Sequence, residues 1–521
     1  MYDVLLRNGT VIDGSGSPMF VADVAISGSR VVAVGALEKK SARMDVDVSG
    51  LYVCPGFVDV TNHSDTHWRL LSHPALESLL YQGITSVVGG SSGSSLAPLP
   101  NTDAFYSIRK WTDVSGLNID WRSVGDFLST IERRGPSVNF STLVGHSTLR
   151  RSLVGDQSRV VNSAEIDVMR DMLSVGLGQG AIGFSTGLGY SHGAHASEDE
   201  IASLVGLVAE SGGVYSTQLR DEYHDVVASV SEALRIADTT SARVHIIHLK
   251  GVGQNGLDNM NKALDLISQA RERGMFVSFD VYPYTVTSSV LYTFLPQWVC
   301  EGGRRMMLSR LRDPQTRSQV IVELENDGVD YSSAVVVSSS SGVSFGQMRL
   351  SDIATSRGAS VEAVMVDLLL ASDGRATVMF DILDASSLDS AIVHPYSLIA
   401  SNGVGYGVDH KQTGEQVHPR NFGAFPRVLS HFVRERGLLS WEEAIAKMTS
   451  YPARVFGLSY RGVLAKGAFA DVCVFDPETI SDKATFDQPY QYSEGVRWLF
   501  VNGRTVIENS VYTGVRAGYV I

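Results

Sequence analysis

Cysteine is scarce in this chain, and its scarcity excludes whole classes of protein. Among 521 residues there are only three cysteines, Cys54, Cys300 and Cys473. They are too few and too scattered for a disulfide framework or a paired-cysteine metal knuckle. Proline is also sparse, with 15 residues against 50 glycines, as in folds with many tight turns between strands and helices.

The chain also lacks an excess of basic residues and long apolar runs. Its formal net charge of -13 argues against a nucleic-acid partner, which requires a basic face. No apolar run approaches the roughly 20 residues that cross a bilayer. The first residues lack the cationic and apolar segments of a signal peptide. We therefore expect a cytoplasmic protein with neither a nucleic-acid nor a membrane partner.

The two ends of the chain share a β-rich texture. Residues 1–52 and 457–521 contain short runs of alternating apolar residues, separated by turn pairs such as Asn8-Gly9 and Asn502-Gly503. Such pairs are typical of tight hairpins. We predict one small β-sandwich domain, built from both termini.

Residues 53–456 alternate short apolar strands with amphipathic helices, which predicts a TIM-like (β/α)8 barrel. A segment at about 291–350 breaks this rhythm and is interpreted as an insertion over the barrel mouth. Among the strands we expect are residues 83–90, 181–187, 214–218, 243–250, 275–284 and 403–409.

In such barrels the functional groups lie at the carboxyl ends of the strands. Asp409 follows the last predicted strand and is the expected general acid/base or anionic ligand. Other polar residues at predicted strand ends include His63, Ser92, His146, Gln218, Arg220, Asp221, Glu222, His248, Lys250, Tyr282 and Tyr284.

Several ordered motifs carry a family resemblance. They include LLRNGTVIDGSG, PGFVDV, QGITSVVGG, VGHSTLR, GFSTGLGY, HLKG, DVYPYTVTSS and HPRNFGAFPRVL. In these motifs the chain resembles the N-acyl-D-amino-acid deacylase (D-aminoacylase) branch of the amidohydrolase superfamily over nearly its whole length. The resemblance implies a (β/α)8 barrel with a small β-domain, and an enzyme that acts at a C–N amide bond.

The resemblance also implies a dinuclear zinc site, and this chain departs from it. The six ligand positions fall on Thr61, His63, Ser92, Gln218, His248 and Asp409. Three of these side chains are neutral replacements: Thr61 for a histidine, Ser92 for the bridging cysteine and Gln218 for a histidine. Hydroxyl and amide oxygens are poor zinc donors beside thiolate and imidazole. We therefore expect a degenerate zinc site and no cofactor.

Two alternatives for a metal stay open. A single ion is a possibility if His63, His248 and Asp409 gather around it. A shifted site would use His63, Asp65 and His67, whose spacing places them on one side of a strand, with help from His192 and His195.

By the same resemblance, the substrate-binding residues are Lys250, Tyr284, Ser289 and Arg420. Lys250 and Arg220 suit a substrate carboxylate, which arginine grips in bidentate fashion. Arg220 and Arg420 have an alternative role as partners in ion pairs within the barrel. Ser92 and Gln218 are expected to line the pocket where the family places ligands.

We predict an enzyme that acts on an N-acyl amino acid or related acylated amine by metal-independent acid–base chemistry. Acyl transfer, condensation and cyclisation suit it, with His63, His248 and Asp409 moving protons. One alternative is a zinc-dependent deacylase with a rearranged site. Another is a catalytically silent protein that binds a ligand. The expected partner is a small-molecule substrate, whose identity and chirality stay open, as does the oligomeric state.

Overall fold

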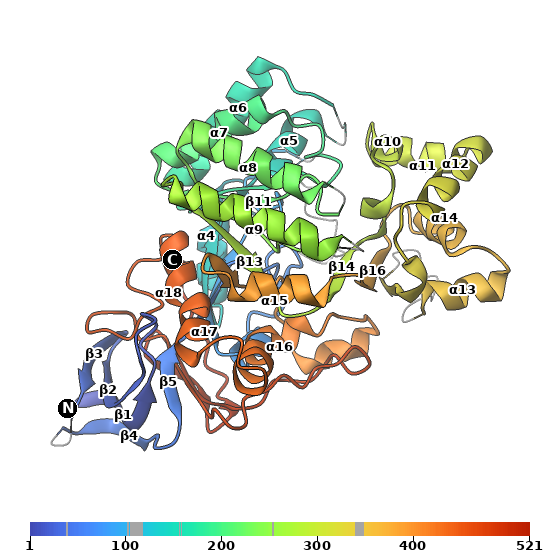
Figure 1. The fold of residues 1–521 in the computed structure, drawn as a ribbon. Helices are drawn as coiled ribbons and strands as arrows, with labels where there is room; N and C mark the ends of the chain where they lie inside the picture. The colour runs from blue at the N-terminus through green and yellow to red at the C-terminus, as the bar shows by residue number, and fades with distance from the viewer. Residues whose placement is uncertain are drawn as a thin grey trace.

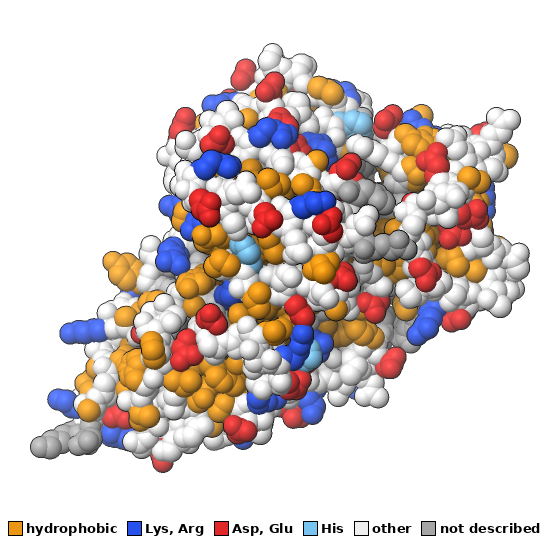
Figure 2. All heavy atoms as spheres, viewed as in Figure 1, with side chains coloured by type: hydrophobic (Ala, Val, Ile, Leu, Met, Phe, Trp, Pro, Cys, Tyr) orange, Lys and Arg blue, Asp and Glu red, His pale blue; other side chains and the backbone are white. Residues whose placement is uncertain are grey.

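The computed structural model describes residues 1–37, 40–101, 104, 118–155, 157, 159–223, 225–252, 255–338 and 348–521. A barrel occupies the centre, a β-domain lies on one side, and a lobe of mostly short helices projects from the other side (Figure 1). Acidic and basic side chains are interspersed over the face of the molecule drawn in Figure 2. In the described ranges, no helix is both long and apolar enough to cross a membrane.

Eight parallel strands form the barrel, with β8 and β9 as two halves of one strand. The parallel bridge between Asn62 and Gly403 joins the first strand to the last. This confirms the predicted (β/α)8 fold. The strands are β6 (Phe57–Asp59), β7 (Ile84–Gly89), β8 (Asn139–Thr142), β9 (Val144–Gly145), β10 (Gly183–Gly187), β11 (Val214–Gln218), β12 (Arg243–Ile246), β13 (Val277–Val281) and β17 (Ser397–Ile399).

Helices surround the barrel strands, and several begin at a residue that caps them. Ser123 and Asn162 each accept a hydrogen bond from the backbone N–H three residues on, and the acidic residue there bonds back. The helices are α1 (Arg69–Ser72), α2 (Glu77–Leu80), α4 (Val124–Arg134), α5 (His146–Val154), α6 (Ser163–Gly178), α7 (Glu198–Glu210), α8 (Val226–Thr240), α9 (Gly256–Glu272), α15 (Ala385–Val393), η3 (Val408–Thr413), α16 (Arg420–Arg427), η4 (Val428–Glu435), α17 (Trp441–Met448) and α18 (Ser450–Val455).

The last barrel strand lies earlier in the chain than predicted. We expected it at residues 403–409, but β17 ends at Ile399 and residues 404–407 form no strand. The alternation of Val404 and Tyr406 with glycine resembles a strand. Both side chains instead pack around Phe422, in a small cluster beside the barrel.

The β-domain is a sheet of nine strands drawn from both ends of the chain. At the predicted turn between β19 and β20, Asn502 and Gly503 have φ of 48° and 78°, as an Asn-Gly hairpin requires. The boundaries at 52/53 and 456/457 stay a prediction. The strands are β1 (Tyr2–Val11), β2 (Phe20–Ser27), β3 (Arg30–Gly35), β4 (Ala42–Asp47), β5 (Tyr52–Pro55), β18 (Val472–Phe475), β19 (Val496–Val501), β20 (Arg504–Glu508) and β21 (Val511–Tyr512).

The projecting lobe is longer than the insertion we predicted, because β16 returns to pair with β14. It has its own apolar core, and residues 339–347 of the predicted segment lie outside the described residues. Its elements are β14 (Val286–Val290), η1 (Leu291–Phe294), α10 (Gln297–Cys300), α11 (Arg304–Arg312), α12 (Pro314–Glu325), η2 (Tyr331–Ser333), β15 (Val335–Ser338), α13 (Leu350–Arg357), α14 (Val361–Ala371) and β16 (Thr377–Asp381).

Candidate active site

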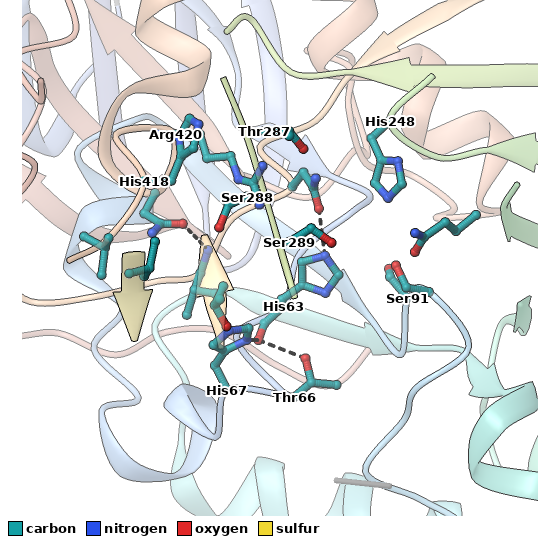
Figure 3. A pocket seen from close by; sticks show the side chains of 18 of the residues that line it. His63, Thr66, His67, Ser91, His248, Thr287, Ser288, Ser289, His418 and Arg420 are labelled. Atoms are coloured by element: carbon teal, nitrogen blue, oxygen red, sulfur yellow. Dashed lines mark hydrogen bonds between the residues drawn. The ribbon is translucent and has the colours of Figure 1, made fainter. Parts of the chain in front are cut away.

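A pocket of about 160 Å³ opens at the carboxyl ends of the barrel strands. His248 and Ser91 lie on one side of it and Arg420 and His418 on the other, with His63 between them (Figure 3). The predicted residues that line the pocket are His63, Ser92, Gln218, His248, Lys250, Ser289 and Arg420. The barrel therefore brings together most of the predicted site from six separate segments of the chain.

Thr61 does not face this pocket. Its hydroxyl donates a 2.6 Å hydrogen bond to Asp280 Oδ2. The same carboxylate bonds the ring of His245 and the backbone N–H of His248. Burial acts to raise the pKa of Asp280, but its bonds with His245 and Thr61 outweigh burial and lower it. Thr61 thus belongs to a buried network that supports the strand ends.

Asn402, rather than Asp409, occupies the end of the eighth strand. Asn402 Oδ1 lies 2.8 Å from His63 Nε2 and lines the pocket. Asp409 does not line the pocket. A Cβ added to Gly407 would meet Asp409 Oδ1 at 2.4 Å and Glu77 Oε2 at 2.7 Å, so both carboxylates crowd that glycine. The structure therefore gives no support to the predicted roles of Asp409 in proton transfer and metal binding.

Glu222 is a pocket residue for which the sequence predicted no role. Its Oε1 lies 2.8 Å from His248 Nδ1, and it also accepts a hydrogen bond from the Lys250 ammonium. Burial acts to raise the pKa of Glu222, but the neighbouring Lys250 ammonium and the His248 side chain outweigh burial and hold it at about 2. The carboxylate is therefore ionised. Its place four residues after the end of β11 was the only signal in the sequence.

Arg420 begins helix α16 and points into the pocket. Its guanidinium lies over the Tyr282 ring, 4.9 Å from the centroid. Its Nε and Nη1 have no hydrogen-bond partner among the described residues, although both atoms are buried. Burial lowers the pKa of Arg420. A buried cation whose N–H donors have no partner is suited to bind an anionic group of a ligand. This favours a role in substrate binding over the alternative role in an ion pair within the barrel.

Two other predicted substrate residues lie away from the pocket. The Arg220 guanidinium is held by Glu232, with Nη2 2.6 Å from Oε1, and by two backbone carbonyls. The alternative of an ion pair within the barrel is therefore correct for Arg220. Tyr284 stacks against Arg427, whose guanidinium lies 4.9 Å from the ring centroid.

The alternative histidine–carboxylate site does not form. Asp65 is buried, and each of its carboxylate oxygens accepts a hydrogen bond from the backbone, of Gly90 and of Thr66. Burial lowers the pKa of His63 to about 3 and that of His67 to about 4. His192 and His195 do not line the pocket.

Comparison with known proteins identifies the family. An amidohydrolase family model matches residues 46–507. The chain is 34% identical over 520 residues to the D-aminoacylase of Alcaligenes xylosoxydans xylosoxydans, which covers 100% of this chain and 97% of that protein. The chain belongs to the amidohydrolase family. It is an enzyme of the D-aminoacylase branch, as the motifs predicted.

Further D-aminoacylase relatives agree in sequence and in structure. The N-acyl-D-glutamate deacylase of the same organism is 33% identical over 507 residues, covering 97% of this chain and 93% of that protein. A D-aminoacylase structure solved to study its binuclear metal centre has a TM-score of 0.84 at 33% identity, covering 100% of this chain and 99% of that one. The Bordetella bronchiseptica N-acyl-D-glutamate deacylase, complexed with zinc and a phosphonate inhibitor, also scores 0.84, at 31% identity and coverage of 100% and 99%.

These metal-containing relatives give no support to our expectation of no cofactor, so we tested the donors themselves. With Asn402 in place of Asp409, four of the six implied ligand positions are neutral: Thr61, Ser92, Gln218 and Asn402. Gln218 donates to Glu222, and the Lys250 ammonium lies 3.0 Å from His248 Nδ1. The described residues contain no group of three His, Cys, Asp or Glu side chains arranged to hold a metal. The residues present do not fit a binuclear zinc centre.

Proposed function

We propose that this amidohydrolase binds an N-acyl amino acid in the barrel pocket and acts at its amide bond by metal-independent proton transfer. The observation that carries the proposal is the 2.8 Å contact between Glu222 Oε1 and His248 Nδ1. Acyl transfer, condensation and cyclisation are the reaction types that suit such a site, because positioning and acid–base groups supply much of their rate.

Arg420 is proposed to bind the substrate carboxylate. Its unpartnered Nε and Nη1 atoms leave N–H donors available to a carboxylate, and such charge-assisted hydrogen bonds are strong. Ser289 lines the same pocket and bears a hydroxyl 3.1 Å from that of Thr293. A carboxylate bound at Arg420 leaves the acyl group to extend past His63 toward His248, on the opposite side (Figure 3).

His248 is proposed to carry the proton. Its Nδ1 lies 2.8 Å from Glu222 Oε1, which also accepts from the Lys250 ammonium, and we assign the imidazole proton to Nδ1, directed at this ionised acceptor. This arrangement leaves Nε2 of His248 as a proton acceptor within the pocket. Glu222 then stabilises the imidazolium that forms when Nε2 takes a proton, as a carboxylate does beside a catalytic histidine.

The reacting carbonyl requires hydrogen-bond donors as well as a base. Ser91 is 1% exposed, lines the pocket, and its hydroxyl has no partner among the described residues. The Lys250 ammonium lies nearby, 3.0 Å from His248. We assign Ser91 and Lys250 to the carbonyl oxygen, where donors fixed in a buried site stabilise developing negative charge.

A second candidate function is zinc-dependent deacylation of an N-acyl-D-amino acid, which is the activity named for the relatives. The sequence identity to these relatives favours zinc-dependent deacylation. The neutral side chains at four of the six implied ligand positions argue against it. D-stereochemistry of the substrate rests on those relatives alone.

Metal content and chelation separate these candidates. The purified protein is assayed with N-acetyl amino acids, with and without amines, before and after dialysis against a chelator. We expect well below one equivalent of zinc and turnover that resists chelation. Near one equivalent of zinc, lost together with activity, would establish the zinc-dependent deacylase instead. Ligand binding without turnover on any N-acyl amino acid would contradict the proposed substrate class.

A further inference from the structure

A second cavity, of about 360 Å³, adjoins the pocket. We call it the side chamber. It lies between the barrel-loop residues 188–194 and 218–223 and the projecting lobe, from which η1, α10 and the end of α12 contribute. The residues that line both the chamber and the pocket are Gln218, Glu222, Tyr223 and Ser289. A ligand in the chamber therefore reaches the proposed reaction centre at Glu222.

Aromatic rings form one wall of the side chamber. The Phe294 ring lies 5.4 Å from that of Tyr223 and 6.0 Å from that of Tyr331, centroid to centroid. Tyr292, on the same 3-10 turn as Phe294, also lines the chamber. Aromatic faces pack against apolar groups and attract cations. The wall thus fits an apolar body that carries positive charge.

The side chamber also has an excess of negative charge. Its arginine, Arg220, is neutralised by Glu232. Glu323 and Asp327 line the chamber. The hydrogen-bond donors that reach them from the described residues are neutral groups: Trp298 and Gln319 for Glu323, and Tyr331 and Val329 for Asp327. Carboxylates beside a low-dielectric wall attract a cation as it enters. The pocket differs, because Arg420 there presents unpaired positive charge.

Gln218 provides an acceptor where the two cavities meet. Its Nε2 donates a 3.0 Å hydrogen bond to Glu222 Oε2, which fixes the orientation of the amide. Its Oε1 is buried and has no hydrogen-bond partner among the described residues, and the residue is only 7% exposed. A buried carbonyl oxygen requires a donor. An N–H group of a ligand supplies it.

We propose that the side chamber binds a primary amine with an aromatic or apolar body, as the acceptor of the acyl group. The proposal rests on the proposed function and specifies its second substrate. The bound ammonium first releases one proton to solvent; the neutral nitrogen then attacks the carbonyl carbon of the N-acyl amino acid and gives its second proton to the His248–Glu222 pair. The C–N bond of the donor then breaks, and the proton passes to the departing amino nitrogen. One amide replaces another, without redox change or further reactant.

Binding is tested apart from turnover, so that the two proposals fail separately. Phenethylamine and its neutral analogue phenethyl alcohol are titrated calorimetrically into the full-length protein. We expect the amine to bind at least tenfold more tightly, because only it gains from the carboxylates and ring faces. Equal affinity of the two compounds would overturn the chamber assignment, whatever the enzyme does to acyl substrates.

Variants locate the amine. Phe294→Leu keeps the apolar volume but removes the ring, and is expected to weaken phenethylamine binding threefold to thirtyfold, about the value of one ring–cation contact. Phe294→Ala also removes the ring and is expected to weaken phenethylamine binding at least as much as Phe294→Leu. Tyr460→Ala is the control, since Tyr460 is 69% exposed and does not line the chamber. Unchanged amine affinity in Phe294→Leu and Phe294→Ala would contradict the site.

Turnover tests the acceptor role. An N-acetyl amino acid is supplied with increasing phenethylamine, and both N-acetylphenethylamine and free amino acid are measured. We expect saturable amide formation, with a half-saturation that matches the calorimetric dissociation constant. Continued release of amino acid with no amide product would refute the acceptor role while leaving the proposed function intact. Amine binding without any turnover would refute the proposed function while leaving the chamber as an amine site.

Discussion

Glu222 Oε1 lies 2.8 Å from Nδ1 of His248, and both side chains are almost fully buried, with exposures of 11% and 6%. The contact orients the imidazole and fixes which nitrogen faces the substrate pocket. Because the carboxylate comes from the loop after β11 and the histidine follows β12, neighbouring barrel strands have to be aligned to create it. The predictions below test this contact and the site around it.

Glu222→Gln is expected to reduce kcat by about 100-fold or more, the usual contribution of a positioned acid–base group. The amide cannot stabilise an imidazolium as a carboxylate does. Steady-state kinetics measure the effect. A melting curve is needed beside it, because the variant also removes the partner of Lys250 and breaking a buried ion pair is destabilising.

The control for this variant is Asp409→Asn, the same chemical change at a carboxylate outside the pocket. It is expected to leave kcat and KM within about twofold, in line with the small effects of most surface substitutions. A large loss of kcat in Asp409→Asn, with none in Glu222→Gln, would reverse the assignment of the acid–base group made here.

Restoring the implied metal donors should create a zinc site. The combined variant Ser92→Cys, Gln218→His and Asn402→Asp, at the replaced positions that line the pocket, supplies the thiolate, imidazole and carboxylate donors that zinc prefers. We expect it to retain at least about one equivalent of zinc, whereas the wild type retains well below one. Elemental analysis after identical growth and dialysis measures both. Equal zinc in the two proteins would show that the native donors already suffice.

Arg420→Met should weaken binding of an N-acyl amino acid by about 10- to 100-fold, since a hydrogen bond to a charged group contributes about 1.5–3 kcal/mol. The corresponding amino acid amide, which lacks the carboxylate, should bind the wild type and the variant about equally. This comparison forms a double-mutant cycle. Equal losses for both ligands would mean that Arg420 acts through the packing of Tyr282 rather than on the carboxylate.

The buried Lys447 side chain leads to a prediction for how the free energy of unfolding depends on pH. It is 4% exposed and donates to His394 O and Ser397 Oγ, and burial lowers its pKa from 10.5 to about 8. Between pH 8 and 10.5 the unfolded chain binds more protons than the folded one, so stability rises with pH in this window. Relative to Lys447→Met, the wild type should gain up to about 3 kcal/mol of unfolding free energy.

Urea unfolding at several pH values between 8 and 10.5 measures this difference. Lys466→Met, at an exposed position, should show no such change relative to the wild type. A difference between wild type and Lys447→Met that stays constant across the window would mean that the buried amine keeps its ordinary pKa.

Much of the fold was predictable because its determinants are local. The alternation of short strand segments with amphipathic helical segments placed β11 at residues 214–218, where the structure has it. The Asn502-Gly503 pair placed a hairpin turn, because both residues tolerate the positive φ that the turn requires. The eighth strand was misplaced because β17 has only three residues, too few for a pattern, while the glycine-rich stretch after it imitates one.

The candidate site was predictable only in part, for a related reason. Each strand end offers several polar side chains, and the sequence does not tell which of them turns inward. Arg220 and Glu222 are two residues apart, yet Glu222 turns into the pocket and Arg220 is held by Glu232 on the next helix. Because the eighth strand was predicted too late in the chain, the residue expected at its end was Asp409 instead of Asn402.

The sequence by itself determined the barrel, the family and the loss of metal donors at Thr61, Ser92 and Gln218, since these depend on residue identity and local periodicity. Only the tertiary structure decided that Asn402 is the fourth neutral position and that Glu222 meets His248. It also decided that a chamber from the lobe opens beside them. Such relationships join residues that are distant in the chain, and only the packing of strands and lobe fixes their distances.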